Sequence, residues 1–362
     1  MIQSMECKSI KSHVSIFSNY GTIRPCCSIN IDDKFDNWEP SSIFHIESLD
    51  QSLRLPVRKQ LYNDLTDGWI DECKYCKNLE DQQFKSTRQH YNEKFTGNGL
   101  EDLQIALDYT CNMTCRSCRP GVSTKWNNLN EEIKDLLQIE QHHYNDIGNH
   151  KVYIKRLRDI LENTSFINLK NLRIIGGEPF YSPNLKWFLS LLNEKIDLKQ
   201  VNFSCNTNCS VIPDNKILDL LSKFKSVKID ISIDAIGKLA ESIRYGVEWG
   251  IIETNLRTWN QLATIMISPT VSILNINKLQ SIIDLGFDYW FMPLNTPFFL
   301  RHTQIPLHIR KKWLTTDENV NKIITMPYEE INKNHFLNAM NIMNRKMNSF
   351  SDANEEIWTL MN

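Results

Sequence analysis

The chain has 362 residues, with 41 Lys or Arg, 43 Asp or Glu and a formal net charge of −2. This balance argues against binding to nucleic acid or to an anionic membrane, because either partner favours a strongly basic surface. The first residues lack the apolar stretch of a signal peptide, and no run of about eighteen apolar residues occurs. We therefore expect a cytoplasmic protein with no nucleic-acid partner and no membrane partner.

The first 98 residues show no alternation of strands and helices. They predict a hairpin in HVSIFSNYGTIRPCC (residues 13–27), a helix near LPVRKQLYNDL (residues 55–65) and a CKYC motif at residues 73–76. These elements contain too few apolar residues for a large core of their own. Residues 1–98 are therefore interpreted as a small domain stapled by metal.

From about Leu100 the sequence alternates short apolar runs with helical patterns, which is typical of βα units around a parallel sheet. In SPNLKWFLSLLNEKI, for example, Ser182 can cap a helix and Pro183 suits its first turn. Six such units predict an α/β fold with a partial (β/α)6 barrel over residues 99–300. The six strands are expected at residues 103–110, 171–175, 200–205, 227–234, 265–274 and 287–293.

Two further segments are predicted to be helical. The patterns LNEEIKDLLQIE (residues 129–140) and YIKRLRDILE (residues 153–162) are amphipathic and would cover the barrel. Residues 301–362 read as a mostly polar helical C-terminal extension.

Cysteine is the residue type that points to chemistry. Thiols in the cytosol are kept reduced, so clustered cysteines indicate metal binding more than disulfides. All ten lie in the first two thirds of the chain, at Cys7, Cys26, Cys27, Cys73, Cys76, Cys111, Cys115, Cys118, Cys205 and Cys209.

The stretch LDYTCNMTCRSCRP, residues 107–120, places Cys111, Cys115 and Cys118 directly after a predicted strand. Three thiolates can each bind one iron of a [4Fe–4S] cluster and leave the fourth iron open. A structural zinc site normally takes four protein ligands, so a zinc site would need a fourth from Cys205 or a histidine. The incomplete set favours the open cluster.

A second motif, IIGGEPF, ends the next predicted strand. Gly176 and Gly177 could let a ligand approach the backbone, and Glu178 adds a carboxylate beside them. Taken alone, this motif could be a simple turn. Together, the CxxxCxxC triplet and GGEP resemble the radical S-adenosylmethionine superfamily, whose fold is a partial (β/α)6 barrel.

The resemblance implies roles for several residues. Cys111, Cys115 and Cys118 would hold a [4Fe–4S] cluster whose open iron binds S-adenosylmethionine, and the three cysteines would thus be the catalytic centre. The cofactor's methionyl, carboxylate and ribose groups would be contacted by Gly176, Gly177, Glu178, Asn206, Ser232, Asp234 and Arg244.

Three of these residues also have a purely structural interpretation. Asn206 could only shape a turn, Asp234 could cap the next helix, and Arg244 could be a solvated surface charge. One position departs from the family pattern: Ser117 stands where an aromatic residue usually packs near adenine. We expect Tyr109 or Phe180 to take over that packing.

The N-terminal cysteines form a second pattern. The spacing of Cys7, Cys26, Cys73 and Cys76 resembles the twitch domain, a short form of the SPASM module, which holds an auxiliary [4Fe–4S] cluster. In familiar members this module follows the barrel, whereas here it would precede it. A zinc ribbon with the same four ligands is the alternative.

The remaining thiols have less definite roles. Cys27 adjoins a predicted ligand and is either a spare thiol or a substitute for Cys26 or Cys7. Cys205 and Cys209 are expected to pack near the barrel mouth, with a radical relay or hydrogen-donor role as an alternative.

The resemblance implies an enzyme that cleaves S-adenosylmethionine to a 5′-deoxyadenosyl radical and abstracts a hydrogen atom from a substrate. We expect a peptide or protein side chain as substrate and an electron donor such as flavodoxin or ferredoxin as partner. The alternatives are a carbohydrate or nucleotide substrate, or a non-catalytic zinc-binding adaptor.

Overall fold

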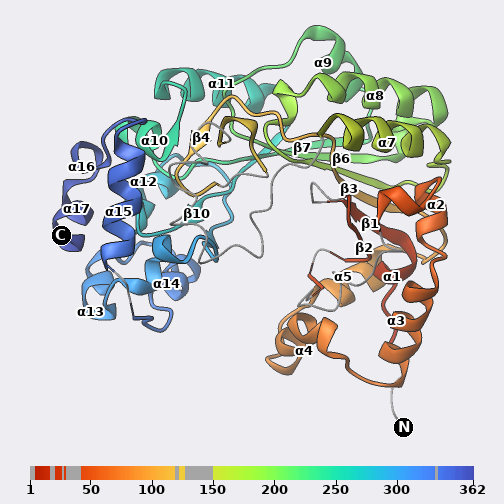
Figure 1. Cartoon of the computed structure of the whole chain (residues 1–362), viewed down its shortest axis with the longest axis horizontal. Coiled ribbons are helices and arrows are strands. Elements are labelled where there is room, and N and C mark those ends of the chain that lie inside the picture. Colours follow the sequence, from red (N-terminus) through yellow and green to blue (C-terminus); the bar gives the residue numbers. More distant parts are fainter. Residues whose placement is uncertain are drawn as a thin grey trace.

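The computed structural model describes residues 5–16, 21–26, 28–29, 42–118, 122–126, 150–330 and 333–362. The pattern at residues 129–140 and Cys27 lie outside these described residues. The fold is mixed α/β around one seven-stranded sheet of order β2-β1-β3-β5-β6-β7-β9. Figure 1 shows this sheet running through the middle of the molecule.

The central strands of the sheet are parallel and follow one another along the chain. Each pairs with the next, and helices lie between them in sequence. The strands are β3 (Asp102–Ala106), β5 (Asn171–Ile175), β6 (Asn202–Thr207), β7 (Ser226–Ile231) and β9 (Thr264–Ile267). The predicted parallel βα arrangement is therefore present.

Of the six expected strands only β5 keeps its bounds, and the departures at residues 103–110 and 265–274 have a clear physical cause. β3 ends at Ala106 and not at Thr110, because the Asp108 carboxylate accepts the Thr110 backbone N–H at 2.8 Å and turns the chain. The strand expected at residues 265–274 is split at Pro269 into β9 and β10 (Thr270–Val271), since proline has no N–H to donate. β10 pairs in parallel with β11 (Met292–Pro293), and a single bridge joins Ile267 to Tyr289.

Helices cover one face of the sheet. Figure 1 shows α7 (His150–Asn163), α8 (Pro183–Lys195), α9 (Asn215–Leu221) and α11 (Trp249–Leu262) along the same side. In α8, Ser182 caps the helix by accepting the Asn184 N–H, and Pro183 occupies the first turn as predicted. Its apolar face is buried at Leu185, Phe188, Leu189 and Leu192.

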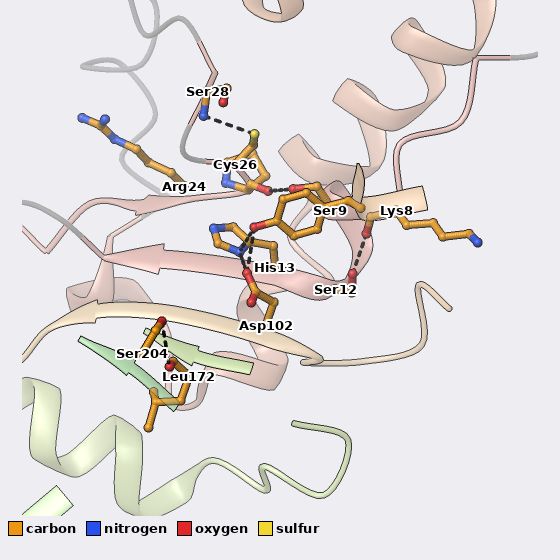
Figure 2. Close-up of polar contacts among 12 residues, drawn as sticks. Lys8, Ser9, Ser12, His13, Arg24, Cys26, Ser28, Asp102, Leu172 and Ser204 are labelled. Atoms are coloured by element: carbon orange, nitrogen blue, oxygen red, sulfur yellow. Dashed lines mark hydrogen bonds and ion pairs between the residues drawn. The ribbon is translucent and has the colours of Figure 1, made fainter. Parts of the chain in front are cut away.

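The predicted N-terminal hairpin forms, and it joins the main sheet. β1 (His13–Ile16) pairs antiparallel with β2 (Ile23–Arg24) and in parallel with β3. Asp102 of β3 points toward His13 of β1 and is hydrogen-bonded to its ring (Figure 2). Val14 and Ile16 are fully buried in the same hydrophobic cluster as the central strands.

Short helices complete the N-terminal region. They are α1 (Ser9–Ser12), α2 (Leu49–Ser52), α3 (Pro56–Asp67), α4 (Lys74–Asp81) and α5 (Thr87–Lys94). The helix predicted near residues 55–65 is α3. Figure 1 places α3, α4 and α5 together, near the N-terminus.

The C-terminal extension is helical, as predicted, but it is not a polar tail. Its α-helices are α13 (Leu307–Arg310), α14 (Glu318–Ile324), α15 (Lys333–Asn344), α16 (Phe350–Ala353) and α17 (Glu355–Met361). Phe336, Met340, Phe350 and Ile357 are 0% exposed and belong to the main hydrophobic cluster. The extension therefore packs as part of the molecule's core, beside α10 (Gly237–Ile243) and α12 (Leu279–Ile283) (Figure 1).

Candidate active site

The segment that carries Cys111, Cys115 and Cys118, called here the three-cysteine loop, follows β3. It is held by contacts to a short 3-10 helix at Thr124–Trp126. Thr124 accepts the Cys111 N–H through its hydroxyl at 3.2 Å and donates its own N–H to the Tyr109 carbonyl. The Trp126 indole N–H donates to the Cys115 carbonyl at 2.9 Å. The loop thus has a defined shape that does not depend on its thiols.

The three-cysteine loop is also held by a strand that lies far from it in the sequence. β4 (Thr114–Cys115) pairs antiparallel with β8 (Arg244–Tyr245), so Cys115 lies opposite Arg244. The Arg244 Nη1 is 3.9 Å from the Cys115 Sγ, and its Nε is 2.8 Å from the Asp234 carboxylate. Burial raises the pKa of the Cys115 thiol, while the Arg244 cation acts to lower it.

All three cysteines of this loop line one hollow of about 760 Å³. Of the seven residues predicted to bind the cofactor, Gly176, Gly177, Asn206, Ser232 and Arg244 line it as well. Glu178 and Asp234 are not among its lining residues and are 1% and 2% exposed. Each contacts residues that do line it: Glu178 contacts Thr207 and Asn208, and Asp234 contacts Arg244. The remaining lining residues are Met113, Ser117, Val122, Ser123, Thr207 and Asn208.

Close backbone packing requires glycine at both positions 176 and 177, which the motif alone did not indicate. A Cβ on Gly177 would lie 2.3 Å from the Thr110 carbonyl oxygen, and a Cβ on Gly176 would lie 2.5 Å from that of Asp108. Gly176 also has a φ of +127°, which other residues rarely adopt. These glycines let the turn after β5 pass against the backbone that leads to Cys111, besides lining the hollow.

Glu178 is a buried acceptor at the centre of this turn. Its carboxylate accepts the Asn208 N–H at 2.6 Å, the Thr207 hydroxyl at 2.8 Å and the Phe180 N–H at 3.1 Å. Burial raises the pKa of Glu178 to about 7, although these hydrogen bonds act in the opposite direction. Glu178 therefore ties the end of β6 to the turn after β5.

The structural interpretations of Asp234 and Arg244 are wrong. α10 begins at Gly237 after Ile236 and has no side-chain cap, whereas Asp234 accepts the Thr270 N–H at 2.7 Å. The Arg244 side chain is 17% exposed and paired with Asp234, so it is not a solvated surface charge.

Asn206 is fixed by a charged neighbour. The Arg173 Nη2 donates to the Asn206 Oδ1 at 2.8 Å and to the Asp230 carboxylate at 2.7 Å. Asn206 is thus more than a turn residue, because its side chain is oriented beside the hollow by Arg173.

The expected aromatic replacements for Ser117 do not reach the hollow. Phe180 packs on Trp259 with ring centroids 4.8 Å apart, Tyr109 lies against Tyr153, and neither ring is among the lining residues. An adjoining hollow of about 280 Å³ shares Met113, Asn208, Ser232 and Arg244 with the first. It adds an apolar wall from Ile233, Ala235, Ala240, Val247, Trp249 and Ile252, which the motifs did not predict.

The four predicted N-terminal cysteines also come together. Cys7, Cys26, Cys73 and Cys76 line a separate hollow of about 370 Å³, with Arg88 among its other lining residues. Burial raises the pKa of Cys7 to about 11 and that of Cys73 to about 12.

This second group lies away from the three-cysteine loop. Cys7 precedes β1 and the loop follows β3; since β1 and β3 are parallel, the two groups lie at opposite ends of these strands. Figure 1 accordingly shows α4 and β4 well apart.

A site for a single metal ion needs several ligand side chains around one point, unlike a site for an iron–sulfur cluster. Within the described ranges, no three His, Cys, Asp or Glu side chains are grouped around one metal-ion position. A cluster has no such requirement, because each thiolate binds a different iron.

The last two cysteines are core residues. Cys205 in β6 and Cys209 after it are both 0% exposed, and neither lines the hollows described above. Burial raises the pKa of both thiols, that of Cys209 to about 12.

Among the helices of the described residues, none has the length and apolar character needed to cross a membrane.

Comparisons with known proteins give distant likenesses only. No protein-family model and no curated protein sequence matches the chain. Similar solved structures include Streptococcus suis SuiB bound to S-adenosylmethionine, at 16% identity over 61% of this chain and 44% of that chain, with a TM-score of 0.34. Native anSMEcpe with bound AdoMet and Cp18Cys peptide is 14% identical over 63% of this chain and 62% of that chain, with a TM-score of 0.37.

A third similar structure is TYW1 with a lysine-pyruvate adduct bound. It is 15% identical over 72% of this chain and 89% of that chain, with a TM-score of 0.34. The chain thus spans less than two thirds of SuiB and of anSMEcpe.

Proposed function

We propose that the chain is a radical S-adenosylmethionine enzyme. The observation that carries the proposal is the single hollow lined by Cys111, Cys115 and Cys118 at the carboxyl ends of parallel strands. In parallel α/β folds, active sites lie at these ends. Three thiols beside an open hollow suit a [4Fe–4S] cluster with one iron left for a cofactor.

The other lining residues suit S-adenosylmethionine. Gly176, Gly177, Asn206, Ser232 and Arg244 would offer backbone groups, an amide, a hydroxyl and a cation to its polar groups, and Glu178 would hold Asn208 in place behind them. The apolar hollow beside Trp249 and Val247 would receive a planar ring such as adenine, which compensates for the missing aromatic residue at Ser117. When bound and reduced, the cluster supplies one electron for cleavage of S-adenosylmethionine to methionine and a 5′-deoxyadenosyl radical.

The chain's own residues have simpler tasks in this reaction. Arg244 contacts the Cys115 thiol and neutralises part of the negative charge that thiolates bring to the hollow. Asp234 in turn fixes the Arg244 guanidinium. The fold around the site would be the partial (β/α)6 barrel of residues 99–300, followed by the extension of residues 301–362.

The substrate and partners are proposed from the resemblance of the N-terminal cysteines to the twitch module. Enzymes with that module include peptide-modifying ones, so we propose a peptide or protein side chain as substrate and a flavodoxin or ferredoxin as electron donor. Residues 1–98 would carry an auxiliary [4Fe–4S] cluster on Cys7, Cys26, Cys73 and Cys76. Their convergence on one hollow supports this, although zinc would use the same ligands.

A spectroscopic experiment tests the cofactor site. The protein is reconstituted anaerobically with iron and sulfide and reduced with dithionite, and its electron paramagnetic resonance spectrum is recorded with and without S-adenosylmethionine. We expect a [4Fe–4S] signal that S-adenosylmethionine changes, and no such response in Cys118→Ala. A colourless protein that holds stoichiometric zinc would contradict the proposal.

Iron counting tests the N-terminal site separately. A variant that lacks all three loop cysteines should retain about four irons per chain if the N-terminal cysteines hold a cluster. Zinc in place of iron in that variant would show that the N-terminal site is a zinc site.

A further inference from the structure

We propose that Arg116 is a positioning residue through which the C-terminal extension holds the three-cysteine loop in place. The proposal rests on the proposed function for its catalytic consequence, and on hydrogen bonds of the structure for the mechanical link. Arg116 lies between Cys115 and Ser117, both of which line the larger hollow.

The Arg116 side chain connects three parts of the chain. Its Nε donates to the Ser242 carbonyl of α10 at 2.8 Å. Its Nη2 donates to the Asn344 Oδ1 at 2.9 Å and to the Asn348 carbonyl at 2.5 Å, at the end of α15 and beyond it. The Arg116 backbone N–H also donates to the Ile243 carbonyl at 2.8 Å. One residue therefore joins the loop, α10 and the extension.

The extension side of this junction is rigidly packed. The Asn344 Oδ1 also accepts the Phe350 N–H at 3.1 Å, and the Phe350 ring lies 5.9 Å from the Arg116 guanidinium carbon. Phe350, Met340 and Met343 are each 0% exposed. A displacement of α15 or α16 would consequently move the acceptors of the Arg116 guanidinium, because the surrounding side chains are buried and closely packed.

The environment of Arg116 makes its position strict. The side chain is 0% exposed, and within the described part of the chain it donates to carbonyl oxygens and one side-chain amide, with no carboxylate among its acceptors. A buried cation that lacks an opposite charge is tolerated only where hydrogen bonds replace water. The Nε and Nη2 atoms are held where these acceptors meet, whereas the buried Nη1 has no hydrogen-bond partner among the described residues. The acceptors of Nε and Nη2 thereby fix the backbone between Cys115 and Cys118.

Arg310 offers a matched control. It is also 0% exposed, and it donates to the carbonyls of Ile305 at 2.7 Å and Met326 at 2.8 Å and to that of Ile324. These acceptors all lie inside the extension. Arg310→Met and Arg116→Met therefore each remove a buried guanidinium, but only Arg116→Met disconnects the cysteine loop.

Hydrogen exchange of the protein without iron tests the link directly. We expect Arg116→Met to speed amide exchange over residues 113–118 by about tenfold or more, since charge-assisted hydrogen bonds to buried groups are lost. Asn344→Ala, which removes an acceptor from the extension side, should speed the same amides, whereas Arg310→Met should not. Equal exchange in all variants, or equal acceleration by Arg116→Met and Arg310→Met, would overturn the proposal.

The reconstituted proteins test the catalytic consequence. Arg116→Met should lose the spectral change on addition of S-adenosylmethionine, and Arg116→Lys should restore part of it, while Arg310→Met keeps it. Faster exchange with an unchanged spectral response would overturn the positioning role. If the wild-type protein itself shows no response, the proposed function fails while the exchange result stands on its own. Should Arg116→Met not fold, Asn344→Ala takes its place in both arms.

Discussion

The turn after β5 shows how a single atom can decide the shape of the site. Gly177 is close to two carbonyl oxygens, those of Thr110 at 2.3 Å and Tyr109 at 2.6 Å from the position of a Cβ. The neighbouring Glu178 N–H donates to the same Thr110 carbonyl at 2.8 Å. The contact therefore aligns the GGE turn with the cysteine loop, and a side chain would force them apart.

Gly177→Ala should destabilise the protein for this reason. Overpacking of this kind costs about 1–3 kcal/mol in the free energy of unfolding. Gly250→Ala is the matched control: Gly250 lies in α11, and the described residues leave open space where its methyl group would stand, so we expect a change within about 0.5 kcal/mol or a slight gain. Urea denaturation of the two variants measures the difference, and equal midpoints would contradict the account.

The short 3-10 helix at His302–Gln304 carries a buried histidine inside the extension. His302 is 1% exposed, and its Nε2 is 2.9 Å from the Ile323 carbonyl of α14. Burial lowers the pKa of His302 to about 4, and the Arg310 cation also acts to lower it. The folded protein therefore holds this ring neutral.

This histidine predicts a loss of stability in acid. Because the folded pKa of about 4 lies below the ordinary value of 6.5, the unfolded chain binds the proton more readily between these values. The contribution of a neutral His302 is fully present above pH 6.5 and is lost as the pH falls toward 4, by up to about 3 kcal/mol. His302→Gln cannot titrate, so urea midpoints should converge between the two proteins as the pH falls. Parallel pH profiles would contradict this.

The N-terminal region is joined to the rest of the molecule by strand pairing and by shared core residues. β1 supplies the parallel partner of β3, and Ile23, Ile43 and Leu49 lie in the main hydrophobic cluster. A chain of residues 99–362 would expose the edge of β3 and part of that core. The domain boundary expected near residue 98 is therefore crossed by strand pairing.

Truncation tests this dependence. We expect residues 99–362 to be aggregated or to melt well below the full chain. Full-length protein with Cys7, Cys26, Cys73 and Cys76 changed to serine is the control, because it keeps β1 while losing the metal site. If the truncated chain is as stable as the full one, the strand pairing contributes little; if the serine variant fails equally, the metal and not the strand is the cause.

Local patterns in the sequence predicted the central elements well. NLRII became β5 with the expected bounds, and Ser182 and Pro183 begin α8 as their chemistry requires. The spacing of cysteines and the two glycines of the GGE motif identified residues that line one hollow, because both motifs directly follow neighbouring parallel strands.

Long-range pairing could not be predicted in this way. The contacts of Arg116 reach residues more than two hundred positions away, and β1 pairs with a strand almost ninety residues later. Neither partner carries a local signal. The burial of Phe336 and Phe350 was missed for the same reason, since the extension reads as mostly polar when its packing surface is unknown.

The production of 5′-deoxyadenosine tests the central claim most directly. The reconstituted, reduced protein is incubated anaerobically with S-adenosylmethionine, and the nucleoside is quantified by chromatography. We predict that the wild-type protein forms 5′-deoxyadenosine, that Cys115→Ala forms none, and that Cys205→Ala, which removes a core thiol away from the hollow, still forms it. Absence of 5′-deoxyadenosine from a wild-type protein that contains its full iron would contradict the account.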